Sequence, residues 1–375
     1  MSNSPKASHQ HAEAPTAAPV ADDRHLAAVM ESLDRIMTIE IRPADGKLPA
    51  GIVSGLYGAC RDAFGEALTG LAERKLRQSV ATNSTVLIAT GAGIGPWLPQ
   101  GETDGPMGAA ALARAITRTL RAKVVMVTEA RHAPAVRAAI KALNYPPGFE
   151  PEVELVEPGE REGRQAAQRL ITLYHPTAAI FIERDGPGTQ GRFHGVRGDC
   201  RSADDVAQLH HLANLAARSS ILTIGIGDGG NEIGFGAHRR RITQRLPGDG
   251  TCRAGCDSGI YTVTKTQVTI SASVSNWGAY ALAAALGASF RLPEACHSAA
   301  AEEVLLKACL EAGARDGATG TSALQTDGIP LATHQHVIAL METVAATTAT
   351  RSLTVEPQPS HIFTPSATKG PRFVS

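Results

Sequence analysis

Short apolar runs alternate with longer amphipathic segments along most of this chain. The runs at 85–90 and 178–182 hold only aliphatic, aromatic and threonine side chains, as strands buried on both faces of a sheet do. The segments between such runs carry apolar residues at three- and four-residue intervals, which predicts helices. Strands are expected at 85–90, 124–128, 153–156, 178–182, 221–224 and 268–272. Helices are expected at 26–37, 52–76, 105–120, 134–143, 161–173, 204–217, from about 232, and at 277–286, 299–312 and 334–347.

This alternation of strands and helices predicts an α/β fold. Crossovers of this length join parallel strands, so we expect a three-layer, Rossmann-like domain with a mostly parallel sheet and helices on both faces. Extra helices are expected at both ends of the domain. A single domain is expected over 23–347, because 1–22 and 348–375 are rich in small residues, Pro and Thr and predict disordered tails.

The overall composition narrows the classes of function. Lys and Arg total 36, as do Asp and Glu, and a net charge of +0 argues against nucleic acid as a partner. No apolar run reaches the ~20 residues that span a bilayer, so we expect a cytoplasmic protein without a membrane partner. The six Cys residues are scattered, which argues against a disulfide framework. Cys252 and Cys256 form a C-x3-C pair, but no second Cys or His pair has the usual spacing, so a zinc site is not predicted.

The most unusual loop is 225–236, which follows the strand expected at 221–224. Six glycines let its backbone adopt left-handed conformations and approach a ligand closely. In a parallel sheet, ligands bind outside the carboxyl ends of the strands, where this loop is expected to lie. The loop therefore predicts a binding site, whose candidate residues are Gly227, Asp228, Gly229, Gly230, Asn231 and Glu232.

Two other strand ends carry carboxylates. Glu102 and Asp104 precede the third expected helix, and Asp104 is placed to cap it. The alternative is a functional carboxylate pair beside the N–H groups of a helix N-terminus, which attract anions. Glu183 and Arg184 directly follow the fourth expected strand and begin a long loop, and long loops without secondary structure are often functional.

The same long loop continues to Arg197 and contains His194. An Arg can hold a substrate carboxylate with two hydrogen bonds, and a His can transfer protons near neutral pH. Both residues could equally belong to a solvated loop whose charges pair with one another. After the last expected strand, Ser275 or Asn276 can cap the next helix, whereas Asn276 and Trp277 could instead contact a ligand.

Gly225, Gly227 and Gly230 also match the G-x-G-x-x-G pattern of dinucleotide-binding loops. That pattern needs an acidic residue roughly 20 residues further on, at the end of the next strand, to bind the ribose. The segment 242–251 is polar and does not have the composition of a buried strand. A nucleotide- or NAD-binding enzyme is therefore a weaker alternative.

Four of these segments resemble the D-glutamate cyclase family, specifically its carboxyl-terminal domain. The similarity runs in order over about 33–286, and a fifth segment, 193–198, resembles another part of the family in divergent form. The animal enzymes that give the family its name carry a second, amino-terminal domain, which implies either a partner protein that supplies it here or a different substrate. The four segments are Glu102-Thr103-Asp104-Gly105-Pro106, Glu183-Arg184, Ile224-Gly225-Ile226-Gly227-Asp228-Gly229-Gly230-Asn231-Glu232-Ile233-Gly234 and Val274-Ser275-Asn276-Trp277-Gly278.

The resemblance implies a hydro-lyase that converts D-glutamate to 5-oxo-D-proline and water, or the reverse. A module that binds an amino acid without turnover is the alternative. For lactam closure we expect Asp228 or Glu232 as the base and Glu102 or Asp104 as the acid. The substrate-binding residues are then expected to be Glu183, Arg184, Arg197, Gly227, Gly229, Gly230, Asn231, Asn276 and Trp277.

No cofactor is required by these assignments. The carboxylates offer hard oxygen ligands, however, so a divalent cation is a second way to polarise the substrate. For Mg²⁺ or Mn²⁺ the expected ligands are Glu102, Asp104, Asp228, Asn231 and Glu232.

Overall fold

Six parallel strands form the central sheet of the protein. The computed structural model describes residues 23–41, 50–246 and 250–350. The strands lie in the order β3-β2-β1-β4-β7-β8, and every neighbouring pair is parallel. This confirms the predicted α/β fold with a parallel sheet. The strands are β1 (Thr85–Thr90), β2 (Lys123–Thr128), β3 (Glu152–Leu155), β4 (Ala178–Ile182), β7 (Leu222–Gly227) and β8 (Val268–Ser271).

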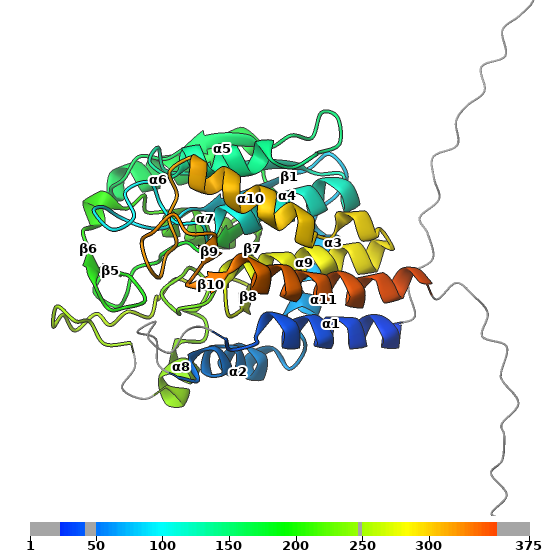
Figure 1. Cartoon of the computed structure of the whole chain (residues 1–375). Coiled ribbons are helices and arrows are strands. Elements are labelled where there is room, and N and C mark those ends of the chain that lie inside the picture. Colours follow the sequence, from blue (N-terminus) through cyan, green and yellow to red (C-terminus); the bar gives the residue numbers. More distant parts are fainter. Residues whose placement is uncertain (1–22, 42–49, 247–249, 351–375) are drawn as a thin grey trace, which may run out of the picture.

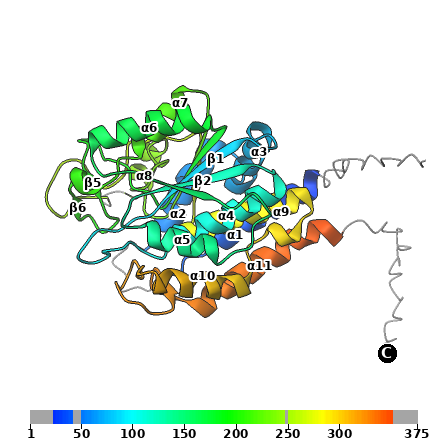
Figure 2. The ribbon, with the colours of Figure 1, turned by 90° about the horizontal axis from the view of Figure 1, so that it is seen from above.

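Helices cover both faces of the sheet and give it three layers (Figures 1 and 2). Alternate side chains of β1 point to opposite faces: Val86 and Ile88 join one core cluster, and Leu87 and Ala89 join the other. The second cluster is covered by α6 and α7, and the first by helices α1 to α5 and α9 to α11. The helices are α1 (Asp23–Met37), α2 (Ile52–Phe64), α3 (Leu68–Ser79), α4 (Pro106–Thr119), α5 (Ala133–Lys141), α6 (Glu160–Tyr174), α7 (His210–Arg218), α8 (Arg239–Arg245), α9 (Ser275–Phe290), α10 (Ala299–Glu311) and α11 (Leu331–Thr350).

The thicker layer is built around α9. Every residue from Ser275 to Ala288 is buried, as in a helix that is enclosed on all sides. Helix α9 packs against α4, α1, α3 and α11, so elements from both ends of the chain surround it (Figure 1). Of these, α1, α3 and α11 belong to the extra helices that the sequence predicted at the two ends of the domain.

Several element boundaries differ from the prediction. The helix expected at 52–76 is two helices, because Gly65 ends α2 in the left-handed conformation at φ 74°. The helix expected from 232 begins only at Arg239, since the N–H groups of Gly234 and Gly236 donate to the carbonyl of Thr264 at 3.0 and 3.1 Å. The helix expected at 204–217 begins at His210.

Two short hairpins were not predicted. One joins β5 (Phe193–His194) to β6 (Cys200–Arg201), and the other joins β9 (Gln325–Thr326) to β10 (Ile329–Pro330). Strands of two residues carry too little alternation to be found in a sequence.

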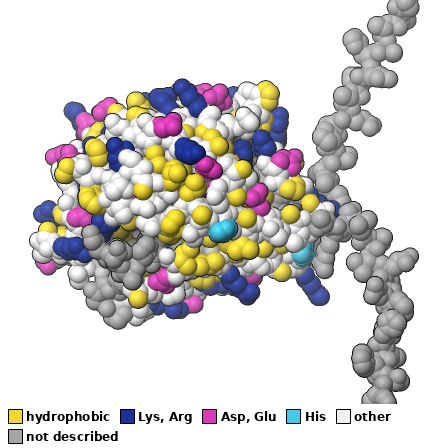
Figure 3. Space-filling view, in the orientation of Figure 1, with side chains coloured by type: hydrophobic (Ala, Val, Ile, Leu, Met, Phe, Trp, Pro, Cys, Tyr) yellow, Lys and Arg dark blue, Asp and Glu magenta, His cyan; other side chains and the backbone are white. Residues whose placement is uncertain are grey.

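The two tails expected to be disordered fall mostly outside the described residues. At the carboxyl end, α11 continues to Thr350, three residues beyond the expected domain boundary at 347. Within the described ranges, no helix combines the length and apolarity needed to cross a membrane. On the face shown in Figure 3, acidic and basic side chains are interspersed.

The strand order determines where a site can lie. Strands β1 and β4 are neighbours, but β1 leads to α4 on one face and β4 leads to α7 on the other. The chain therefore leaves this pair of strands in opposite directions, which is the position where α/β sheets bind ligands. The loops after β1, β4, β7 and β8 all emerge at this edge.

Candidate functional site

Three carboxylates from three of these loops meet at the carboxyl edge of the sheet. Asp104 follows β1, Glu183 follows β4 and Asp228 follows β7, and one oxygen of each lies within 4.8 Å of the others. We call these three residues the carboxylate cluster. Asp104 and Asp228 are buried and Glu183 is half-buried. Three acids this close in a buried position require protons or a cation to offset their repulsion.

Helices α4 and α9 begin beside the carboxylate cluster and cap each other. The carboxylate of Asp104 accepts the backbone N–H of Asn276 at 2.7 Å and that of Ser275 at 2.9 Å, which are the first residues of α9. In return, Asn276 Oδ1 accepts the N–H of Gly105 at 2.9 Å and that of Gly108 at 2.7 Å, at the start of α4. The expectation that Asp104 caps its own helix was therefore wrong, as was the expectation that Ser275 or Asn276 caps α9.

Glu183 is fixed by its backbone and by α9. It adopts the left-handed conformation at φ 45°, which is uncommon for a residue with a side chain. Its carboxylate accepts a short hydrogen bond from the hydroxyl of Ser275. Ser275 also donates its N–H to Asp228 at 3.2 Å, so this one residue contacts the whole carboxylate cluster.

The loop predicted at 225–236 begins later than expected, because β7 continues to Gly227; the rest of the segment folds back against β7 and is held by its own Glu232. A Cβ at Gly225 would lie 2.1 Å from the carbonyl oxygen of Ile233, so only glycine allows this return. Glu232 Oε1 accepts the N–H groups of Asp228 at 3.0 Å and Gly229 at 2.8 Å. The side chain of Glu232 is 1% exposed, so it shapes the loop that presents Asp228.

Asn231 links the loop to a buried ion pair that the sequence did not predict. Its amide donates to Asp185 at 2.8 Å and to the carbonyl of His194 at 3.2 Å. Asp185 in turn pairs with Arg201, which lies on β6. The isolated sequence gives no signal for Arg201, because only the pairing of β5 with β6 brings it to this edge.

Burial and mutual repulsion raise the pKa values of this region. Burial raises the pKa of Glu102, Asp104 and Glu183 well above the usual range of carboxyl groups. The nearby Asp327 raises the pKa of Glu102 and Asp104 further, and Asp228 does so for Glu183. Arg201 acts in the opposite direction on the pKa of Glu102.

Asp327 was also missed in the sequence. It occupies the turn between β9 and β10 with Gly328, and both residues have positive φ, 55° and 74°. An Asp-Gly pair between two short strands is a strong hairpin signal, so this turn could have been found. Its position beside Glu102 follows from the packing of the carboxyl-terminal segment and is not visible in the local sequence.

The side chains of three predicted substrate-binding residues, Arg184, Trp277 and Arg197, bond to other groups of the protein. The Arg184 guanidinium is 2% exposed, forms an ion pair with Glu129 and donates to the carbonyl of Ala207 at 2.6 Å. Trp277 is fully buried, and its indole donates to His334 at 2.8 Å.

The third, Arg197, is half-buried and bridges two segments. It donates to the carbonyl of Ala318 at 2.5 Å, and its guanidinium carbon lies 5.7 Å from the ring centre of Trp97. It also reaches the carbonyl of Gly317 at 3.4 Å. A Cβ at Gly317 would lie 2.0 Å from Glu102 Oε2, so the segment that Arg197 holds adjoins Glu102.

The predicted metal ligands are only partly brought together. Asp104 and Asp228 meet with Glu183, which the sequence suggested only as a substrate contact. Asn231 and Glu232 turn instead to Asp185 and to the glycine loop. Carboxylate oxygens at this spacing suit a hard divalent cation.

The glycine-rich loop lacks the local geometry of a dinucleotide site. Such loops lead directly into a helix whose N-terminus holds the pyrophosphate. Here the segment after Glu232 is turns, and α8 begins at Arg239. The loop also presents Asp228 rather than free N–H groups, because Glu232 accepts those of Asp228 and Gly229.

Comparison with known proteins identifies the family of the chain. The chain is 27% identical over 296 residues to the mitochondrial D-glutamate cyclase of Homo sapiens, an overlap of 67% of this chain and 44% of that protein. The chain thus spans less than half the length of this relative. The family model described as D-glutamate cyclase-like, C-terminal, matches residues 60–342. The match includes all of the carboxylate cluster and most of the chain, and the protein belongs to this D-glutamate cyclase-like family.

Proposed function

We propose that the protein is a lyase that converts D-glutamate to 5-oxo-D-proline and water, or catalyses the reverse. One observation carries the proposal: within a D-glutamate cyclase-like fold, Asp104, Glu183 and Asp228 converge at the carboxyl edge of the sheet. Lactam closure needs a base for the amine and an acid for the departing oxygen, and the carboxyl groups at this edge are candidates for both roles.

The reaction is an intramolecular condensation in which the protons lost by nitrogen equal those gained by the departing oxygen. The substrate ammonium loses two protons as its nitrogen bonds to the γ-carboxyl carbon, and one γ-carboxyl oxygen gains two protons and leaves as water. A base close to the nitrogen and an acid close to the departing oxygen are therefore required. Holding glutamate in a folded conformation lowers the remaining barrier, because both reacting groups belong to one molecule.

We assign Asp228 as the base and Glu102 as the acid. Asp228 belongs to the carboxylate cluster, whereas Glu232 is occupied in holding the loop, so Glu232 is a positioning residue. Glu102 and Asp104 both have raised pKa values, chiefly from burial. Asp104 accepts three backbone N–H groups, which favour its ionised form, while no side-chain bond from a described residue reaches Glu102. Glu102 is thus better suited to carry a proton.

Arg197 is the proposed partner of a substrate carboxylate. Arg184 is almost fully buried and paired with Glu129, whereas Arg197 is half-buried and bonds to the segment 317–318, whose Gly317 adjoins Glu102. Its present acceptors are backbone carbonyls, which a carboxylate can replace with a stronger, charge-assisted bond. Arg197→Gln should therefore raise KM more than it lowers kcat.

A divalent cation fits the same site. Asp104, Glu183 and Asp228 offer three hard oxygen ligands, and Mg²⁺ or Mn²⁺ held there would neutralise their repulsion and polarise a bound carboxyl group. The assignments of Asp228 and Glu102 stand on their positions and hydrogen bonds and do not depend on the ion.

The direct test is incubation of the purified protein with D-glutamate, L-glutamate or 5-oxo-D-proline, with and without Mg²⁺ or Mn²⁺. Chiral chromatography should show interconversion of D-glutamate and 5-oxo-D-proline. Asp228→Asn should abolish it, and Asp62→Asn, an exposed acid paired with Arg245 on the surface, should not. Equal rates in wild type and Asp228→Asn would refute the assignment of the base.

A binding module without turnover is the second candidate. It is favoured by one finding, that the chain spans only 44% of the human relative. In that case calorimetry would detect binding of D-glutamate while chromatography detects no conversion. Addition of the remaining part of the relative as a separate protein would then be required for turnover.

A further inference from the structure

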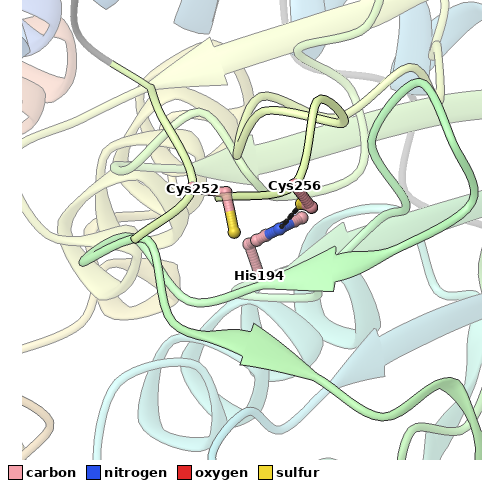
Figure 4. Close-up of side chains that lie close together, drawn as sticks. All are labelled: His194, Cys252 and Cys256. Carbon is pink, nitrogen blue, oxygen red and sulfur yellow. Dashed lines mark hydrogen bonds between the residues drawn. The ribbon is translucent and has the colours of Figure 1, made fainter. Parts of the chain in front are cut away.

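A second cluster of chemically reactive side chains, separate from the carboxylate cluster, lies beside the hairpin of β5 and β6. His194 on β5 meets Cys252 and Cys256, which lie in the segment after α8 (Figure 4). One ligand atom of each residue lies within 4.8 Å of the others. His194 Nε2 is 3.1 Å from Cys256 Sγ. All three side chains point toward one another.

The hairpin brings a fourth side chain to this cluster. Cys200 pairs directly with His194 in the antiparallel register of β5 and β6. Directly paired residues of an antiparallel ladder lie on the same face, with their Cβ atoms about 4.5–5.5 Å apart. Cys200 is exposed and lies outside the group of three whose ligand atoms approach within 4.8 Å, so its thiol would turn inward from this shared face to become the fourth ligand.

We propose that His194, Cys200, Cys252 and Cys256 bind one Zn²⁺ ion as a structural site. Three thiolates and one imidazole form a set that zinc binds tetrahedrally in closed structural sites. The sequence did not predict this site, because its ligands come from two segments about fifty positions apart and only the C-x3-C pair has recognisable spacing.

The backbone around Cys252 is arranged for a thiolate. A tight turn closes where the N–H of Gly255 donates to the carbonyl of Cys252 at 3.2 Å, and Gly255 adopts φ 72°. The backbone N–H groups of Cys256, Ala254 and Gly255 are directed at the Cys252 sulfur. Donors directed at a sulfur favour the ionised form that binds metal.

His194 also has the form that a metal needs. Its side chain is 1% exposed. Its Nε2 is the atom directed at Cys256, and in the neutral ring this nitrogen can donate its electron pair to an ion.

The site would connect the hairpin to the carboxylate cluster. The N–H of Arg253 already donates to the carbonyl of Gly198 at 2.8 Å, so the two ligand segments are in contact. The carbonyl of His194 accepts from Asn231, and Cys200 precedes Arg201, which pairs with Asp185. Zinc bound here would thus hold the segment that presents Arg201 to the buried acids, whichever reaction the protein catalyses.

The test is metal analysis of the purified full chain after dialysis in buffer without chelator. Inductively coupled plasma mass spectrometry should find about one zinc per chain. In titrations with Co²⁺, the wild type should show the strong thiolate-to-metal absorption bands of a site with several sulfur ligands. Cys252→Ser, Cys256→Ser and His194→Ala should each lower zinc content at least about tenfold, because structural zinc needs its full ligand set.

Two further variants sharpen the result. Cys309→Ala removes a buried cysteine on α10 that contacts Ala135 of α5 and does not belong to the cluster, and it should keep full zinc content. Cys200→Ser should weaken zinc binding and reduce the Co²⁺ charge-transfer band. Wild-type protein that takes up neither Zn²⁺ nor Co²⁺, or that mass spectrometry shows to carry a Cys252–Cys256 disulfide under reducing conditions, would overturn the proposal. Equal zinc content in all variants would identify adventitious metal and would also overturn it.

Discussion

Asp104 and Asn276 each cap the helix that the other begins. Asp104 accepts the N–H groups at the start of α9, and Asn276 accepts those at the start of α4. The two caps place both helix N-termini beside the carboxylate cluster, where their partial positive charge stabilises the ionised acids. The same bonds therefore stabilise the fold and position a member of the site.

Removal of the Asn276 cap should destabilise the protein. Asn276→Ala leaves the buried N–H groups of Gly105 and Gly108 without their acceptor, which should cost about 1–3 kcal/mol in the free energy of unfolding. Urea denaturation followed by circular dichroism measures this. Asn144→Ala, at an exposed position, should change stability by less than ~0.5 kcal/mol. Equal stabilities of the two variants would show that the cap contributes nothing.

The return of the glycine-rich loop onto β7 should depend on Gly225. Gly225→Ala places a Cβ 2.1 Å from a backbone oxygen, which cannot rotate away as a side chain can. We expect a loss of about 1–3 kcal/mol in stability and loss of any activity that requires Asp228. Gly95→Ala is a suitable control, because the nearest atom to its Cβ would be 4.0 Å away. A fully stable and active Gly225→Ala protein would contradict the close return.

The layered parallel sheet could be predicted from the sequence because its signal is local. Each buried strand, such as 85–90 or 178–182, is an apolar run, and each crossover has helical periodicity. The boundaries of α7 and α8 could not be found, since tertiary hydrogen bonds such as those from Gly234 to Thr264 replace helical ones.

The candidate site could be predicted only in part, for a related reason. Asp104, Glu183 and Asp228 each follow a strand, so the topology alone brings them to one edge. Arg201 and Asp327 reach the same region through hairpins with two-residue strands. The Asp327-Gly328 turn has a local signal, but the packing of either hairpin against the sheet edge does not. The direction of a side chain, such as Trp277 toward His334, is likewise set by packing.

Stability should fall with rising pH because of Glu102. Burial and nearby acids raise the pKa of Glu102 above the value near 4.5 that it has in the unfolded chain. Between these two pKa values the folded protein binds more protons than the unfolded chain, so the free energy of unfolding decreases as pH rises, by up to about 1.4 kcal/mol per pH unit. Glu102→Gln removes this titration and should flatten the decrease.

Urea denaturation at a series of pH values from about 5 to 8 measures this slope. The exposed Glu303→Gln variant should follow the wild-type curve, because its acid pairs only with Lys307 on the surface. A steeper decrease in Glu102→Gln than in wild type would mean that the pKa of Glu102 is not raised.

Loss of Arg201 should extend the decrease in the free energy of unfolding to higher pH. Arg201 lowers the pKa of Glu102 and pairs with the buried Asp185. Arg201→Gln should therefore raise the pKa of Glu102 and cost about 3–5 kcal/mol in stability, because Asp185 keeps a buried charge without its partner. The double variant Arg201→Gln with Asp185→Asn should recover part of this loss. If it is instead less stable than Arg201→Gln alone, the two side chains do not act as a pair.

A divalent cation should bind the carboxylate cluster and be detectable without any turnover. Mn²⁺ offsets the repulsion among Asp104, Glu183 and Asp228, so it should raise the Tm of the wild type, and the free ion should be depleted in electron paramagnetic resonance titrations. Glu183→Gln removes one ligand charge and should weaken Mn²⁺ binding at least about tenfold, while Glu303→Gln leaves it unchanged. The affinity for Mn²⁺ and the increase in Tm that it causes should both be larger at higher pH. Protons and the cation compete for carboxylates whose pKa is raised. Identical Mn²⁺ affinities in wild type and Glu183→Gln would exclude this cluster as the binding site and leave proton sharing as the way its charges are balanced.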